Sequence, residues 1–150
     1  MPSDFDADRS RLLFPWLAPF YTGLADLSWL LMRVAAGAIF AVHGWPKIQA
    51  PFKNVGMVEG LGFSPGVFWS PLLAGTEFFG GILLAIGWLT RPAAAGATIV
   101  LLVTTYFHWV VQNQGLAGAE KSLLWAAITF FFAVRGGGFL SVDGLLRKEI

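Results

Sequence analysis

The stretch LADLSWLLMRVAAGAIFAVHGW, residues 24–45, decides the fold, because it is apolar over the length of a bilayer-spanning helix and carries few ionisable side chains. A helix that crosses the hydrocarbon core of a bilayer needs about 20 such residues. Three further stretches of this kind follow, at residues 67–89, 92–111 and 116–134. Glu120 and Lys121 interrupt the last one near its start. The sequence therefore predicts four transmembrane helices.

The composition supports an all-α, integral membrane four-helix bundle. Hydrophobic residues make up 56% of the 150 residues and charged residues 13%, against roughly 25% charged residues in soluble domains. The net charge of +1 argues against a nucleic-acid partner. The chain has no cysteine, which excludes disulfides and thiol redox chemistry by the chain itself. Any redox role therefore needs a cofactor or a partner protein.

Basic residues at the ends of the spans predict that both termini lie in the cytoplasm, by the positive-inside rule. In that orientation the cytoplasmic side holds Arg9, Arg11, Arg91, Arg135, Arg147 and Lys148, and the outer side holds Lys47, Lys53 and Lys121. The first residues are acidic, unlike the basic start of a cleavable signal peptide. We expect residues 1–23 to form a tail at the membrane surface, residues 24–140 the helical domain, and residues 141–150 an interfacial tail whose Leu145 and Leu146 face lipid.

Ionisable residues recur at helical spacing on the first two spans. At about 100° per residue, Arg33 and Lys47 share one stripe with His43 beside it, and Glu77 and Arg91 share another. An ionisable group at the bilayer centre costs about 2.5 to 3.5 kcal/mol, so both stripes should face the bundle interior. Because Arg33 and Glu77 have similar expected depths, we expect them to form an ion pair. A simpler interpretation is that this pair only fixes helix register.

Four ionisable residues at the outer ends of the spans should converge into a polar pocket open toward the outer leaflet: His43, Lys47, His108 and Glu120. Simpler interpretations exist here too. The histidines can hydrogen-bond backbone carbonyls at helix ends, and Glu120 can form a surface ion pair with Lys121. Neither close ligand spacing nor a cluster of carboxylates supports a metal or haem site.

Small and aromatic residues predict how the helices pack. Small residues let helix backbones approach closely in lipid. They form faces at Gly37, Ala41 and Gly44, at Gly81 and Ala85, and at residues 93–97. Tryptophans near span ends prefer the headgroup level. We expect that position for Trp29, Trp45, Trp69, Trp88 and Trp109.

Several motifs together resemble the DoxX family of small bacterial membrane proteins. They are RVAAGAIFAVHGWPKI at 33–48, TEFFGGILLAIGWLTRPAAAG at 76–96, His108, Glu120 and GGGFLSVDGLL at 136–146. The resemblance implies a four-helix bundle in the bacterial inner membrane, related to the membrane subunit of thiosulfate:quinone oxidoreductase. The family's motif residues carry over to Arg33, Gly37, His43, Gly44, Lys47, Glu77, Gly80, Gly81, Gly87 and Arg91.

Our leading hypothesis is a membrane subunit or partner in quinone-linked redox chemistry. Arg33, His43 and Lys47 would bind the quinone cofactor, and Glu77, His108 and Glu120 would take the catalytic, proton-carrying roles. Electrons would come from a redox partner protein or a small reductant, and the sequence leaves open whether the chain is catalytic on its own. The alternatives are a proton-coupled small-solute transporter acting through Glu77 and a non-catalytic membrane assembly factor. Each is compatible with a homo-oligomer.

Overall fold

The computed structural model describes residues 12–146, and over this range the protein is all-helical, without strands. The four long helical segments are α1 (Ala18–Gln49), α3 (Gly66–Ile86), α4 (Thr90–Tyr106) with its π-helical continuation η3 (Phe107–Val111), and α5 (Gly115–Arg135). The short ones are η2 (Pro15–Leu17), α2 (Val55–Gly60) and α6 (Val142–Leu146). Each of the four long segments is long and apolar enough to cross a membrane. The prediction of four spans is confirmed.

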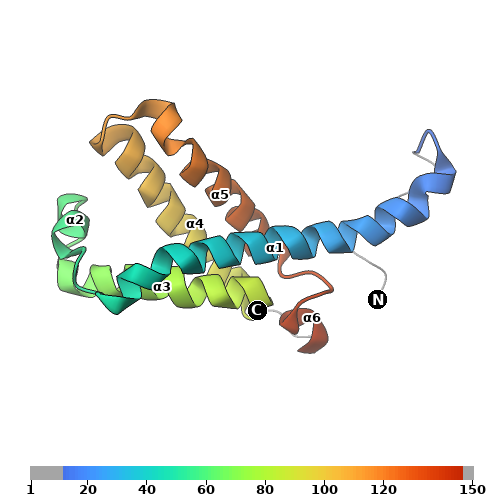
Figure 1. Ribbon diagram of the computed structural model, residues 1–150, viewed down its shortest axis with the longest axis horizontal. Coiled ribbons are helices and arrows are strands. Elements are labelled where there is room, and N and C mark those ends of the chain that lie inside the picture. The colour runs from blue at the N-terminus through green and yellow to red at the C-terminus, as the bar shows by residue number, and fades with distance from the viewer. Residues whose placement is uncertain (1–11, 147–150) are drawn as a thin grey trace.

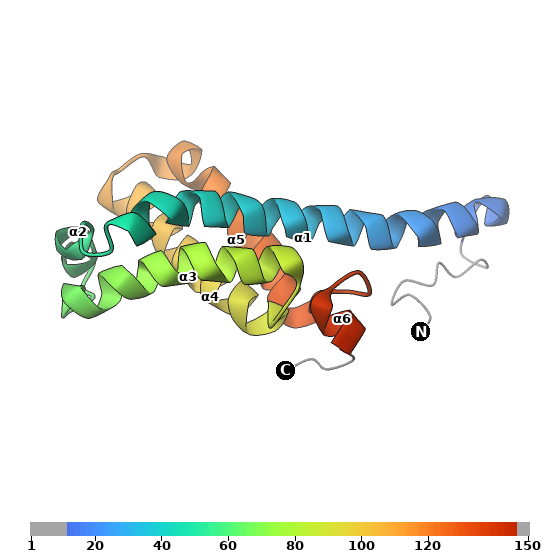
Figure 2. The ribbon, with the colours of Figure 1, turned by 60° about the horizontal axis from the view of Figure 1, so that its bottom comes forward.

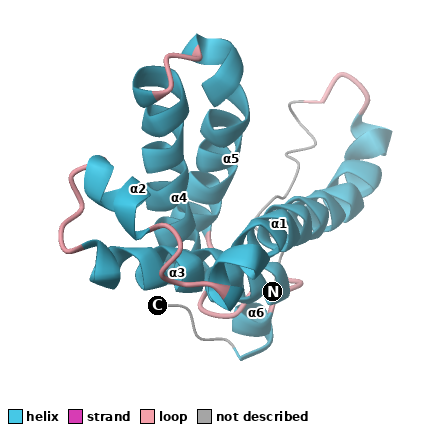
Figure 3. Ribbon diagram, turned by 60° about the vertical axis from the view of Figure 1, so that its left-hand side comes forward, coloured by secondary structure: helices cyan, strands magenta, loops and turns pink. Residues whose placement is uncertain are grey.

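The long helices form two antiparallel pairs, α1 with α3 and α4 with α5 (Figure 1). The pairs approach each other where α3 joins α4 and where α5 ends, which we call the closed end. They diverge toward the other end, where α1 ends and α5 begins, which we call the open end (Figures 1 and 3). The space between the diverging pairs is where a site can form.

Glycines bring the α1 and α3 backbones into direct contact. A Cβ atom on Gly81 would lie 2.7 Å from the carbonyl oxygen of Gly37, and one on Gly44 would lie 2.7 Å from the backbone carbonyl carbon of Glu77. Association of helices in lipid depends on such close van der Waals packing, because lipid supplies no hydrophobic driving force. The predicted small faces of the first two spans therefore do meet.

The α4–α5 pair is joined by hydroxyl groups as well as by packing. The Thr98 hydroxyl donates to Oγ1 of Thr129 at 2.9 Å, and the Thr105 hydroxyl donates to Oγ of Ser122 at 3.0 Å. Hydrogen bonds between helices commonly stabilise helix association inside membranes. Hydrogen bonds as well as packing therefore hold α4 and α5 together.

The segment after α5 fastens the closed end. Asp143 of α6 is buried, and its carboxylate accepts hydrogen bonds from the backbone N–H groups of Leu89 and Thr90, each at 2.9 Å, and from the Thr90 hydroxyl at 2.7 Å. Its own N–H donates to the Gly87 carbonyl at 2.9 Å. A carboxylate at the start of α4 satisfies free N–H groups and complements the helix dipole. The exposed Leu145 and Leu146 continue from this cap.

Arg33 contacts the same segment and not Glu77, so the predicted Arg33–Glu77 ion pair is wrong. The Arg33 side chain is 2% exposed, and its guanidinium donates to the carbonyls of Gly137 and Leu140, the latter at 2.7 Å. Side chains on a helix point toward its N-terminus, which for α1 is the direction of the closed end. At the closed end, the backbone carbonyls of the residues that follow α5 have no helical N–H group as a hydrogen-bond partner. Arg33 satisfies those carbonyls.

Trp29 also ties α1 to the end of α5. Its indole N–H donates to the Gly136 carbonyl at 3.3 Å, and its ring packs 4.8 Å from that of Phe131, measured between centroids. Trp29 was predicted only to lie at headgroup level, and its packing against the end of α5 was not predicted. The N-terminal part of α1 projects beyond the closed end (Figure 2). At about 1.5 Å per residue the whole helix is longer than the roughly 30 Å hydrocarbon core.

Candidate functional site

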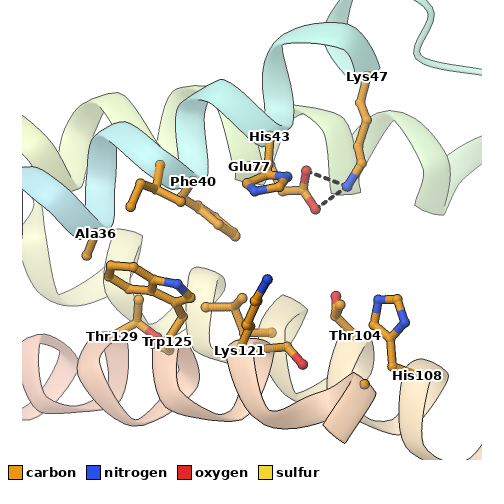
Figure 4. A pocket seen from close by; sticks show the side chains of 14 residues that line it. Ala36, Phe40, His43, Lys47, Glu77, Thr104, His108, Lys121, Trp125 and Thr129 are labelled. Atoms are coloured by element: carbon orange, nitrogen blue, oxygen red, sulfur yellow. Dashed lines mark hydrogen bonds and ion pairs between the residues drawn. The ribbon is translucent and has the colours of Figure 1, made fainter. Parts of the chain in front are cut away.

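A cavity of about 360 Å³ lies between the two helix pairs toward the open end (Figure 4). We call it the polar pocket. Every long helix contributes to its lining: α3 contributes Glu77 alone, and the other three contribute residues spaced three or four positions apart, as one helix face does. The principal lining residues are Phe40, His43, Lys47, Glu77, Thr104, His108, Lys121, Trp125 and Thr129. The volume lies within the range of small-molecule sites, about 300 to 1,000 Å³.

Glu77 and Lys47 form an ion pair on one wall of the polar pocket. The Lys47 ammonium lies 2.5 Å from both carboxylate oxygens of Glu77. Glu77 is 4% exposed, whereas Lys47 is partly exposed. A buried carboxylate needs such a charged partner to offset its desolvation. The partner of Glu77 is therefore the lysine at the end of α1, one of the residues predicted to reach the pocket.

His108 lies in η3, at the end of the α4 segment, and faces the polar pocket (Figure 4). Its Nδ1 is 3.1 Å from Oε1 of Gln114. An amide oxygen only accepts hydrogen bonds, so the contact is a hydrogen bond in the tautomer whose proton lies on Nδ1. Nε2 is then available to accept a proton or a hydrogen bond from a ligand. That is the arrangement a proton-transferring histidine requires.

His43 and Lys121 face each other across the polar pocket, His43 from α1 and Lys121 from α5 (Figure 4). Neither side chain forms a hydrogen bond or an ion pair with any residue between 12 and 146. Both are free to donate to a ligand in the cavity. Since Lys47 and Glu77 neutralise each other, Lys121 leaves the pocket with a surplus positive charge that favours electron-rich oxygen atoms.

Glu120 is exposed and does not line the polar pocket, contrary to its predicted convergence with the histidines. Neighbouring residues on a helix point about 100° apart, so only one of Glu120 and Lys121 can face the cavity. That Lys121 lines the pocket was not predicted from the sequence. The pattern that indicates it is the spacing of Lys121, Trp125 and Thr129, which places all three on one face of α5.

The predicted site residues divide between the two ends of the molecule. His43, Lys47 and His108 line the polar pocket together with Glu77, which was expected to pair with Arg33 instead, whereas Arg33 is held at the closed end and does not line it. Within residues 12–146, no three His, Asp or Glu side chains cluster as a metal site would require. The pocket combines aromatic walls with a few polar donors, which suits a planar organic cofactor.

Comparison with known proteins gives a consistent family. The sequence model of the DoxX family matches residues 28–109. The chain is 30% identical over 128 residues to "Inner membrane protein YqjF" of Escherichia coli, an alignment covering 84% of this chain and 97% of that protein. It is 27% identical over 124 residues to "Putative oxidoreductase CatD" of Bacillus subtilis, covering 82% of this chain and 90% of that one.

A third relative, an uncharacterised protein of Haemophilus influenzae, is 27% identical over 127 residues and covers 79% of this chain. No solved structure matches the chain. The family match covers more than half of the sequence, and four candidate spans accompany it. The chain is a multi-pass protein of the bacterial inner membrane and belongs to the DoxX family.

Proposed function

We propose that the polar pocket binds the headgroup of a membrane quinone and that the protein is a membrane subunit or partner of a quinone-linked oxidoreductase. The observation that carries this proposal is the placement of free donors on opposite walls of one cavity. His43 on α1 and Lys121 on α5 face across it, with the rings of Phe40 and Trp125 between the pairs (Figure 4). A quinone is a flat ring with a carbonyl oxygen at each of two opposite edges, and it needs that arrangement.

Two further ionisable residues of the polar pocket supply the protons. Reduction of a quinone to a quinol adds an electron pair to the ring and a proton to each carbonyl oxygen. His108, which lines the cavity, and Glu77, held by Lys47, are the groups that can pass protons to those oxygens. Arg33 and Glu120 take no part in this proposal, because neither lines the pocket.

Electrons enter from outside the chain. The chain contains no cysteine, so the electron pair comes from a redox partner protein or a small reductant. The name of the Bacillus subtilis relative, a putative oxidoreductase, supports this class of function. The role of the present chain is then to hold the acceptor in the membrane, where a quinone dissolves, and to supply its protons.

The test is a binding titration of the purified protein in nanodiscs with a short-chain quinone, followed by ligand competition. Lys121→Met removes one donor while keeping the length and apolar stem of the side chain. Loss of a hydrogen bond from a charged group costs about 1.5 to 3 kcal/mol, which corresponds to a Kd roughly tenfold to a hundredfold higher.

Lys53→Met is the matched control, because Lys53 is exposed in the α1–α2 connection and lines neither cavity. We expect it to bind the quinone as the unmodified protein does. The proposal fails if the unmodified protein shows no saturable binding. It also fails if Lys121→Met and Lys53→Met bind the quinone equally well.

A further inference from the structure

A second cavity, of about 440 Å³, adjoins the polar pocket on the side of α2. We call it the apolar groove. It runs between α3 and α4, and its lining includes Val58 of α2, Leu73 of α3, and Gly96, Val100 and Val103 of α4. Most of this surface is hydrocarbon, in contrast with the histidines and lysines of the polar pocket. A polar headgroup would find few hydrogen-bond partners there, whereas an apolar chain would make van der Waals contacts.

The two cavities share part of their lining. Lys47, Glu77, Thr104 and His108 line both of them, so the ion pair and the π-helical histidine stand at the junction. A ligand whose head occupies the polar pocket therefore has the apolar groove as its neighbour, on the other side of these four residues. This shared boundary distinguishes the groove from an unrelated lipid-facing crevice.

The groove is long as well as apolar. On α3 its lining runs from Trp69 to Glu77, about 12 Å at a rise of about 1.5 Å per residue. Along α4 and η3 it runs from Gly96 to His108, about 18 Å by the same rise. Gly96 and Thr76 line the groove from opposite helices. A Cβ atom on Gly96 would come 3.2 Å from the methyl group of Thr76, so the absence of a side chain at Gly96 keeps the groove open there.

We propose that the apolar groove binds the isoprenoid tail of the same quinone whose headgroup occupies the polar pocket. This inference rests on the proposed function and adds to it the class of substrate, a quinone with a long tail. Because lipid is as apolar as the groove, the tail gains van der Waals contact and a fixed direction rather than escape from water. The tail should therefore contribute to affinity in the membrane, and filling the groove should abolish that contribution selectively.

The experiment compares two ligands with one headgroup, a tailless benzoquinone and the same ring carrying a decaprenyl or decyl tail. Val100→Trp fills the groove, and Leu102→Trp places the same ring on the exposed face of the same helix as a control. Affinities are expressed per quinone in the nanodisc, so that partition into lipid cancels. A milder variant, Gly96→Ala, narrows the groove by one methyl group and reports the same effect if the tryptophan disturbs folding.

We expect the unmodified protein and Leu102→Trp to prefer the tailed quinone by about tenfold, equivalent to about 1.4 kcal/mol. In Val100→Trp this preference should vanish while the tailless ligand binds within about twofold of the unmodified protein. Gly96→Ala should lie between them. Tailless binding by Val100→Trp also shows that the variant is folded.

Three outcomes would overturn the inference. The first is an equal affinity of the unmodified protein for tailed and tailless quinones, and the second is a tail preference that survives in Val100→Trp and Gly96→Ala. The third is an equal loss of both ligands in these variants, which would mean that the groove does not act on the tail. Failure of the tailless quinone to bind the unmodified protein would instead refute the proposed function, so the two failures are distinguishable.

Discussion

The carboxylate of Glu77 accepts hydrogen bonds from the ammonium group of Lys47, which lies 30 positions earlier in the chain. This pair connects the middle of α3 to the end of α1 and lines both cavities. It therefore stabilises one helix pair and also presents its charges to any ligand at the junction. Substitutions can separate these two roles.

We predict that Glu77→Gln destabilises the protein by about 1 to 3 kcal/mol, because it leaves the Lys47 ammonium without its charged partner. Replacing both partners by apolar residues, Lys47→Met with Glu77→Leu, should restore most of this stability, since no buried charge is left unpaired. Quinone binding should stay impaired in the double variant. The measurements are unfolding in detergent and a quinone titration on the unmodified protein, Glu77→Gln, Lys47→Met, Glu77→Leu and the double variant.

A double-mutant cycle decides between the structural and functional interpretations of the pair. If the double variant regains both stability and quinone affinity, the pair only holds helices together, as the assembly-factor hypothesis requires. If the losses of stability in the two single variants simply add up to the loss in the double variant, the coupling energy between Lys47 and Glu77 is zero. The ion pair then contributes nothing to stability.

Asp143→Ala should reduce stability by about 1 to 3 kcal/mol, because the N–H groups of Leu89 and Thr90 lose their acceptor inside the closed end. Thermal unfolding in detergent measures the loss. Asp26→Ala, on the projecting part of α1, is the control and should leave the melting temperature unchanged. Quinone affinity should be the same in both variants, since Asp143 lines neither cavity. A stable Asp143→Ala protein would show that the cap is dispensable.

Two glycines on α3 differ in what surrounds them, and that difference yields a paired prediction. Gly81→Ala should destabilise the protein by about 1 to 3 kcal/mol, because its methyl group would collide with the backbone of α1. Gly75→Ala should be neutral or slightly stabilising, since its nearest neighbour would be a ring atom of Phe79 at 4.0 Å and alanine favours helix. Detergent unfolding of both variants measures the contrast. Equal effects would mean that the α1–α3 contact tolerates a shift.

The four spans and the small faces through which α1 and α3 meet were predictable, because both depend on properties that the sequence displays directly. The length of an apolar run determines whether a helix can cross a bilayer. Small residues at helical spacing mark where backbones meet, as Gly37 and Gly81 do. These features need no knowledge of which helix stands beside which.

The partners of individual side chains were less predictable, for two physical reasons. Depth along a helix locates a backbone atom, but a long side chain such as that of Arg33 reaches about a turn away, toward carbonyls of a loop far along the chain. Helix phase matters equally at the site. Glu120 and Lys121 are neighbours in sequence, and only the packing of α5 against α4 decides that Lys121 faces the polar pocket.

Arg33→Met tests the reassignment of that arginine from the cofactor site to the closed end. We expect a lower melting temperature in detergent, because the carbonyls of Gly137 and Leu140 lose their donors within a buried contact. Arg33→Lys should recover only part of the loss, since one ammonium cannot reproduce the two-pronged geometry of a guanidinium. Quinone affinity should remain within about twofold in both variants, in contrast to the loss expected for Lys121→Met. A variant that keeps its stability but binds quinone tenfold more weakly would return Arg33 to the cofactor site.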